Sequence, residues 1–156
     1  MGRIEARLKE LGLQLPEDRL VPRANAVHWR RSGRTVYVSG QGPFWGGKFV
    51  LLGRVGKDLT VEQGKEAARI AALNILAHLK DACGGDLDRV TACLMLQAFV
   101  RCTDDCNDTP IVVNGASDLI VAVLGEAGRH ARYAIGCNAL PRDIPVEIGG
   151  VFETAE

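Results

Sequence analysis

The chain has 156 residues, and its nineteen lysine and arginine residues are balanced by nineteen aspartate and glutamate residues. This length is typical of one domain that buries about two-thirds of its surface, and the balanced charge argues against nucleic acid as the main partner, because phosphate binding requires clustered basic residues. No run of about eighteen apolar residues is present, so we expect no membrane-spanning segment and no membrane partner.

The N-terminal segment predicts a short amphipathic helix, because Ile4, Leu8 and Leu11 fall on one helical face. It lacks the apolar core of a secretory signal, so we expect a cytoplasmic protein. Residues 14–24 contain two prolines and predict a loop. We therefore divide the chain into an N-terminal helix and linker over 1–23 and a single α+β domain over 24–156.

Five cysteines are present, an odd number without a disulfide-like spacing, which predicts five free thiols. The loop 102–108 contains two cysteines and three aspartates and suggests a metal site. A closed zinc site needs four ligands, however, and no second cysteine or histidine pair follows at finger spacing. We expect an acidic surface loop there, and neither a metal nor another cofactor in the protein.

The first half of the proposed domain predicts a hairpin and a long helix. Strand-like segments over 26–30 and 35–39 flank a turn at Ser32-Gly33. The glycine-rich segment 40–47 predicts an irregular loop, and 48–56 a short irregular strand. Thr60 and Gln63 have the spacing of a capping box and predict a helix start. The apolar face of this helix contains Ala68, Ala71, Ala72, Ile75, Leu76 and Leu79, and Gly84-Gly85 ends it.

The second half predicts a strand, a helix and two more strands. The strand from Arg89 to Arg101 is apolar on both faces, which is typical of a central strand covered on both sides. Thr109 as N-cap and Pro110 at the first helical position predict the second helix start. Its buried face contains Val113, Ala116, Ile120, Val123 and Leu124, and Gly125 follows it. Residues 131–139 and 146–153 predict the last strands.

The predicted order is β-β-α-β-α-β-β, an α+β fold with one sheet and two helices. Two helices can cover only one face of the sheet, while the long central strand offers apolar side chains to the other face. A large apolar face needs a partner, and a closed homo-oligomer is the simplest one.

Two charges interrupt the last two strands. Arg132 and Glu147 both lie in apolar strand patterns. Burial of an isolated ion costs several kcal/mol, so such a charge is normally paired or binds a ligand. The pattern predicts a small polar site that accepts an anion. A structural ion pair involving Arg132, and a solvent-facing position for Glu147, are the alternatives.

Several short motifs carry a resemblance to a known family. They are Val38-Ser39-Gly40-Gln41, Asn114 in the second helix, Ala131-Arg132, Leu140-Pro141 and Val146-Glu147-Ile148. On these residues, the chain resembles the YjgF/RidA family, also called the endoribonuclease L-PSP family, over residues 24–153. The N-terminal helix and the Asn114–Asp118 segment indicate a longer, divergent branch.

The resemblance implies a chorismate-mutase-like fold, a homotrimeric barrel and sites in clefts between subunits. It also implies an imine/enamine deaminase that hydrolyses 2-iminoacids to 2-ketoacids and ammonia. By the same resemblance, Arg132 would hold the substrate carboxylate and Glu147 would place the attacking water. The substrate-binding positions would be Ser39, Gly40, Gln41, Asn114 and Tyr133. The expected partners are two further copies of the chain and a small carboxylate-bearing metabolite at the subunit interface.

The sequence also departs from the family pattern. Ala26 aligns with a family tyrosine, and Tyr133-Ala134 replace a serine and a cysteine. These changes favour a second hypothesis, a trimeric protein that binds a small carboxylate without turnover. Ribonuclease activity is a third and weaker one, because no histidine acid–base pair and no basic face are recognisable. Asn114 could also be an ordinary polar helix residue, and Phe44-Trp45 either a lid or loop packing.

Overall fold

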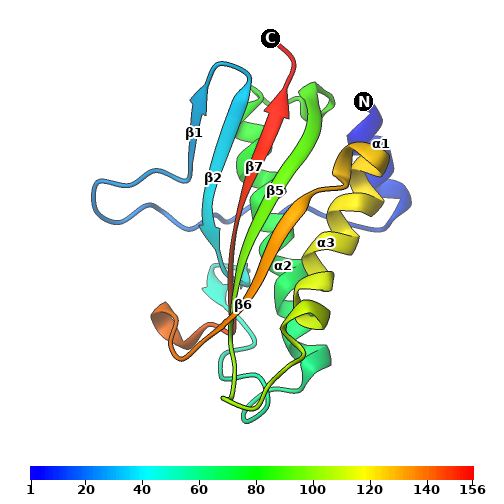
Figure 1. The fold of residues 1–156 in the computed structure, drawn as a ribbon. Coiled ribbons are helices and arrows are strands. Elements are labelled where there is room, and N and C mark those ends of the chain that lie inside the picture. The colour runs from blue at the N-terminus through cyan, green and yellow to red at the C-terminus, as the bar shows by residue number, and fades with distance from the viewer.

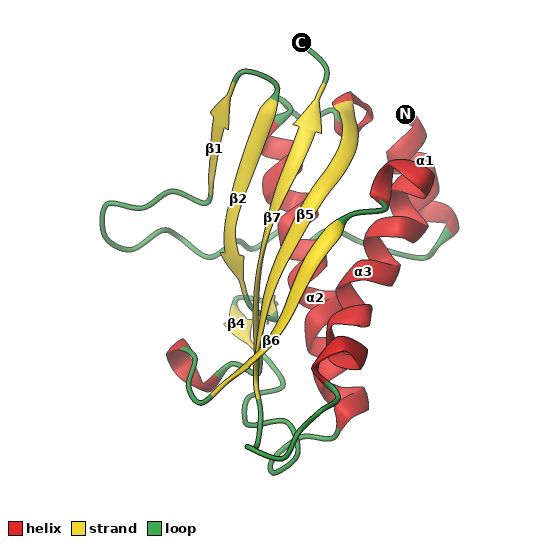
Figure 2. Ribbon diagram, viewed as in Figure 1, coloured by secondary structure: helices red, strands yellow, loops and turns green.

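A five-stranded sheet with two long helices on one face forms the body of the protein, which a computed structural model describes over residues 1–156 (Figures 1 and 2). The strands are β1 (Trp29–Ser32), β2 (Thr35–Gln41), β3 (Phe44–Trp45), β4 (Lys48–Phe49), β5 (Val90–Arg101), β6 (Ala131–Cys137) and β7 (Val146–Thr154). The helices are α1 (Arg3–Glu10), α2 (Val61–Ala82) and α3 (Thr109–Leu124). The main sheet has the order β1-β2-β7-β5-β6, in which only β5 and β6 pair in parallel. The predicted α+β architecture is confirmed, with a small β3–β4 ribbon added.

The two long helices begin in different ways. The capping box predicted for α2 is present, since the Gln63 N–H donates to Thr60 Oγ1 at 3.1 Å and the Thr60 N–H to Gln63 Oε1 at 2.9 Å. The cap predicted for α3 is wrong by one residue, because the N-cap position belongs to Asp108. The hydroxyl of Thr109 instead donates to the Ala134 carbonyl of β6 at 2.9 Å. The Thr109 hydroxyl therefore bonds to a carbonyl of β6 and does not cap the helix.

The N-terminal hairpins also differ from the prediction. β1 starts at Trp29 rather than residue 26, and Ser32 pairs with Thr35, so the turn lies one residue later than predicted. The segment expected to be an irregular loop contains the β3–β4 ribbon. Gly46 and Gly47 have φ values of +59° and +78°, as a two-residue type I′ hairpin turn requires. The glycines therefore make a tight turn.

The hydrophobic core lies between the sheet and the helices α2 and α3, and α1 extends it. Ile4 and Leu8 of α1 are buried in the same core cluster. The Asp88 carboxylate accepts hydrogen bonds from the backbone N–H of Ile4 at 2.7 Å and of Arg3 at 2.6 Å, which lowers the pKa of Asp88. The predicted N-terminal segment is thus anchored to the body of the protein through its helix.

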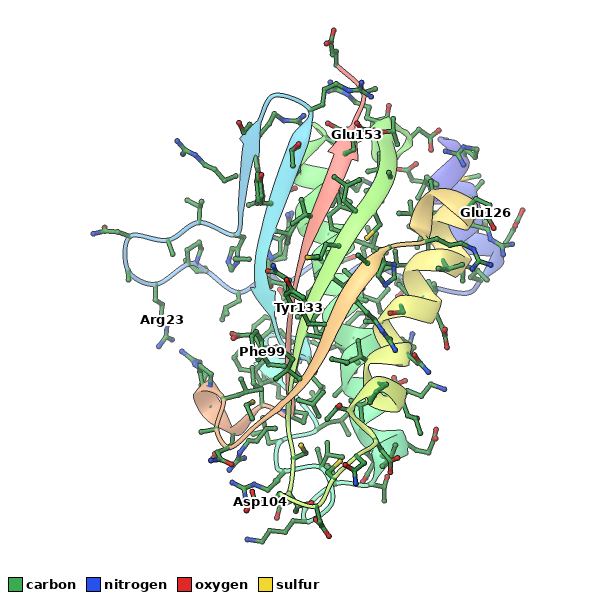
Figure 3. The ribbon with its side chains drawn as sticks, viewed as in Figure 1. Arg23, Phe99, Asp104, Glu126, Tyr133 and Glu153 are labelled. Carbon is green, nitrogen blue, oxygen red and sulfur yellow. The ribbon has the colours of Figure 1, made fainter.

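The other face of the sheet has no helix over it (Figure 1). Five large apolar side chains on it are 40–51% exposed: Tyr37, Leu94, Phe99, Tyr133 and Ile135. Phe99 and Tyr133 can be followed on this side of the sheet in Figure 3. The prediction that β5 is covered on both faces is therefore wrong for a single chain. We call this surface the open face.

One segment, Thr109–Gly128, is long and apolar enough to cross a membrane by length and composition alone. That no segment spans a membrane stays a prediction. The segment includes α3, whose apolar side packs in the core, and half of its most apolar window is buried. A core helix passes the same test, so this finding is weak evidence for a membrane span.

Candidate functional site

Arg132 projects from the helix-covered face of β6, the edge strand beside α3 (Figure 1). It pairs in register with Leu96, which is fully buried under the helices. Its Nη1 donates to Ser117 Oγ at 3.0 Å and its Nη2 to the Pro110 carbonyl at 3.3 Å. Both acceptors belong to α3. The guanidinium is therefore held in the gap between the edge strand and this helix.

Asn114 lies on the same face of α3. It follows Pro110 by four residues and precedes Ser117 by three, the spacing that places helix residues on one face. Its side chain is half-buried. Asn114 therefore lies on the face of α3 that carries the two acceptors of Arg132.

Two further residues complete this polar cluster, and the sequence did not reveal them. Ser117 Oγ lies 2.9 Å from His130 Nε2, and His130 Nδ1 lies 2.6 Å from the Gly128 carbonyl. The sequence positions 117 and 130 form no known serine–histidine motif spacing. The turn Gly125–Gly128 reverses the chain after α3 and brings His130 back beside that helix. We call Arg132, Asn114, Ser117 and His130 the β6–α3 group.

Glu147 belongs to a second cluster on the open face. It pairs in register with Phe99, and both side chains point away from the helices. β2 has a β-bulge beside it, where Ser39 and Gly40 together oppose one residue of β7. A Cβ atom at Gly40 would lie 2.7 Å from Glu147 Cγ. A glycine is therefore needed for the glutamate side chain to lie against the bulge.

Ser39 and Gln41 use their side chains to hold the bulge. The Gln41 Nε2 group donates to the Ser39 carbonyl at 3.1 Å and lies 3.4 Å from His28 Nδ1. Ser39 Oγ donates to the His28 carbonyl at 3.2 Å. Gln41 is only 4% exposed, so its side chain is engaged inside the protein. We call Ser39, Gly40, Gln41 and Glu147 the bulge group.

The two groups do not meet within one chain. Arg132 points to the helix side of the sheet, whereas Glu147 and Tyr133 point to the open face, and β5 separates β6 from β7. Neither Arg132 nor Glu147 forms an intrachain ion pair. A structural ion pair between these two residues in one subunit is therefore excluded by the alternation of side chains along the strands.

Three hollows of the single chain lie elsewhere. One of about 560 Å³ lies between α2 and the loop before β1, one of about 500 Å³ lies between the segment after α1 and the β3–β4 turn, and one of about 420 Å³ lies between the outer surfaces of α2 and α3. Arg132 and Glu147 line none of these three hollows.

The cysteines and acidic residues offer no competing site. All five thiols are free, as predicted. Burial raises the pKa of Cys93 to about 12 and that of Cys102 to about 11, so both are protonated and weakly nucleophilic at neutral pH. Carboxylate oxygens of Glu5, Asp86 and Asp88 lie within 4.8 Å of one another. Asp88, however, already accepts the N–H groups of α1, and Glu5 pairs with a lysine at 3.4 Å.

Comparison with known proteins adds independent information. A family model described as "YjgF/chorismate mutase-like, putative endoribonuclease" matches residues 5–146. Protein TCP17 of Trypanosoma cruzi is 40% identical over 153 residues, which cover 97% of this chain and 94% of the relative. The crystal structure of Atu1372 from Agrobacterium tumefaciens, a protein of unknown function, is 44% identical with a TM-score of 0.90, and the match covers 97% of this chain and 92% of that one. The E. coli protein TdcF, solved with bound serine, is 20% identical with a TM-score of 0.61 over 90% of this chain and 94% of its own, which shows a shared fold alone.

Proposed function

Because the chain belongs to the YjgF/chorismate mutase-like family, we propose that it is a homotrimeric hydrolase that converts reactive 2-iminoacids to 2-ketoacids and ammonia. The reaction adds water to the carbon of a protonated imine and releases ammonium. The substrate is already electrophilic, so the protein has mainly to hold its carboxylate and place one water. The observation that carries the proposal is the Arg132 guanidinium, held at the sheet edge with N–H donors to spare.

Arg132 suits the binding of a carboxylate. A guanidinium has five N–H donors, and two of them are used by Ser117 and Pro110, which leaves three. Two parallel donors of a planar fork match the two oxygens of a carboxylate, which a lysine ammonium cannot reproduce. The half-buried position strengthens the attraction relative to bulk water.

Glu147 suits the placement of a water molecule. Its carboxylate can accept a hydrogen bond from water and take up a proton during the attack on the imine. It is half-buried on the open face next to the apolar Phe99, and the Gly40 backbone lies directly against it. This packing limits the positions that the carboxylate can adopt.

A trimer would unite the two groups. In a ring of three copies, each interface joins different surfaces of neighbouring chains, so the β6–α3 group of one subunit can face the bulge group of the next. The exposed apolar side chains of the open face, listed above, support such an assembly, because large apolar side chains gathered on one face of a protein favour an interaction surface there. The three open faces would line the inside of the barrel.

A carboxylate-binding protein without turnover is the second candidate, and Ala134 favours it. The family has a cysteine at this position, but an alanine offers no group for proton transfer. Ala134 lies on the helix side of β6, and the hydroxyl of Thr109 bonds to its carbonyl. In this candidate Arg132 would still hold the carboxylate, and Glu147 would have no reaction to assist.

Ribonuclease activity has less support, in spite of the family description. His28 and His78 lie together, but their rings stack with centroids 4.2 Å apart and planes 18° apart. Stacked rings do not flank a phosphate from two sides as an acid and a base would. His130 is bonded to Ser117 and to a backbone carbonyl, so it is not free for this role either.

A coupled assay separates these candidates. An amino-acid oxidase generates 2-iminoacids in the presence of the purified protein, and the release of 2-ketoacid is followed in a buffer that slows spontaneous hydrolysis. A faster release than with heat-denatured protein supports the hydrolase. An unchanged release, together with calorimetric binding of the 2-ketoacid, supports the carboxylate-binding protein. Light scattering should give three times the chain mass of 16.8 kDa, and a soluble monomer would contradict the shared site.

A further inference from the structure

We propose that Ser117 and His130 are positioning residues that fix the orientation of the Arg132 guanidinium for carboxylate binding. They are connected to Arg132 by hydrogen bonds of 3.0 and 2.9 Å in series. The inference rests on the proposed carboxylate site, and it extends that site to a serine and a histidine for which neither the motifs nor the family resemblance gave a role.

The direction of each hydrogen bond in this series follows from the chemistry of the groups. Arg132 can only donate, so Ser117 Oγ accepts from it. The Gly128 carbonyl can only accept, so His130 carries its proton on Nδ1. In the neutral imidazole the remaining His130 nitrogen, Nε2, then accepts the single Ser117 proton. The neutral imidazole therefore gives one continuous chain of donors from the guanidinium to the helix-end carbonyl.

This arrangement is not the default one for a helical serine. A serine inside a helix often bonds back to the carbonyl four residues earlier. Ser117 instead directs its hydroxyl out of α3, where His130 accepts the proton and leaves the oxygen lone pairs free for Arg132. The His130 acceptor thereby determines which way the hydroxyl points.

As a consequence, the plane of the Arg132 guanidinium is fixed. Its two terminal nitrogens are anchored to Ser117 and Pro110, which lie about two turns apart on one face of α3. The three remaining N–H donors then point in directions that the anchors set. A fork that is ordered before the ligand arrives avoids the entropy cost of immobilising a long side chain on binding.

Ser117→Ala tests the inference with little risk to the helix, because alanine is the best helix former. We expect the Kd for 2-oxobutyrate and the KM for the imine to rise about two- to twelve-fold, the cost of ordering one side chain, with kcat within about two-fold. Ser117→Thr keeps the hydroxyl and should restore most of the affinity. Asp118→Ala, an exposed neighbour on the same helix, is the matched control and should bind as the wild type does.

A double-mutant cycle separates positioning from a general structural effect. A lysine at position 132 has no planar fork to orient, so Ser117→Ala should change the Kd by less than about two-fold in the Arg132→Lys background. The same loss in both backgrounds would overturn the inference. His130→Phe keeps a ring of similar shape but removes the acceptor, and should weaken binding less than Ser117→Ala does.

A measurement without ligand distinguishes this inference from the proposed function. In NMR spectra, the terminal Arg132 nitrogens should give separate signals in the wild type and merge in Ser117→Ala, because hydrogen bonds slow rotation of the guanidinium. Merged signals in the wild type would overturn the positioning role. Separate signals in a wild type that binds no 2-oxobutyrate would instead contradict the proposed function and leave the positioning role intact.

Discussion

The two groups of candidate site residues are held in place by different means. In the β6–α3 group, side chains bond to one another across a strand, a helix and a turn, with Ser117 as the common partner. In the bulge group, the shape of the backbone holds the residues in place, because Glu147 lies where only a glycine at position 40 leaves room. The first group orients a cation by hydrogen bonds, and the second places an anion by close packing.

The groups also lie on opposite sides of the sheet, which has a consequence for assembly. A single chain offers the Arg132 guanidinium at its helix-side edge and the Glu147 carboxylate on its open face. If the proposed iminoacid is the substrate, both residues have to reach the same small molecule. In our proposal, quaternary structure is therefore part of the active site, and the predictions below test each group alone before they test the two together.

The largest effect is expected from the β6–α3 group. Arg132→Ala removes two charge-assisted hydrogen bonds to the carboxylate, each worth about 1.5–3 kcal/mol, and should weaken 2-ketoacid binding by roughly a hundred-fold or more. Arg132→Lys keeps the charge but loses the fork and should cost roughly ten-fold. Calorimetry gives both values. If Arg132→Ala instead dissociates or unfolds the assembly, the arginine has a structural role and the assignment is wrong.

Substitutions in the bulge group should lower turnover and leave the affinity for the ligand unchanged. Glu147→Gln keeps the shape but loses the base, and should lower kcat by roughly a hundred-fold, as is typical of a general base, with a nearly unchanged Kd. The coupled oxidase assay and calorimetry measure the two quantities separately. A parallel loss of affinity would show that Glu147 contacts the ligand. A wild type that binds without turnover would support the second candidate.

Gly40→Ala should give a smaller loss of the same kind. The added methyl group would lie 2.7 Å from Glu147 Cγ, so the carboxylate has to move away from the bulge. We expect a roughly ten-fold lower kcat, because a misplaced catalytic group loses much of its effect. Gly33→Ala, at a hairpin turn with φ of +57°, strains the backbone away from Glu147 and is a control for a general loss of stability. Equal losses in the two variants would contradict the packing role of Gly40.

Mixed trimers test whether the groups come from different chains. Each Arg132→Ala and each Glu147→Gln homotrimer should be nearly inactive. If a site takes its arginine from one chain and its glutamate from the next, random mixing at equal amounts leaves about a quarter of the sites intact. Refolding the two variants together should then recover about a quarter of wild-type activity. No recovery, with mixed trimers demonstrated by native mass spectrometry, would contradict a site shared between neighbouring chains.

The sequence predicted the long elements well because their signals are local. The capping box at Thr60 and the apolar face of α2 depend only on residues within the helix, and both are present. The start of α3 was displaced because Thr109 bonds to a strand that is distant in sequence. The pairing of Ser117 with His130 was missed for the same reason, since it depends on how the turn after α3 returns the chain. Long-range contacts of this kind leave no spacing rule in the sequence.

Among these variants, substitution of His78 is expected to have the smallest effect at neutral pH. This histidine packs against His28, which contacts Gln41 of the bulge group. His78 is 3% exposed and stacks on His28, whose ring lies 3.4 Å from the Gln41 amide. Burial, and then the charges of His28 and Arg19, lower the pKa of His78 from 6.5 to about 4. Its Nε2 atom has no hydrogen-bond partner, so no bond opposes this shift.

The lowered pKa of His78 makes the folded state less stable at acid pH. Between pH 6.5 and 4 the unfolded chain binds a proton that the folded chain does not, so stability falls as the pH falls through this window and is unaffected at pH 7. With about 1.4 kcal/mol per pH unit, the loss at pH 5 is about 2 kcal/mol per chain. His78→Leu should remove this part of the acid sensitivity in urea unfolding at pH 7 and 5, at one fixed protein concentration. An equal acid loss in the variant would show that the sensitivity arises elsewhere. A decline of wild-type activity before unfolding in this window, absent from His78→Leu, would link His78, through His28 and Gln41, to the bulge group.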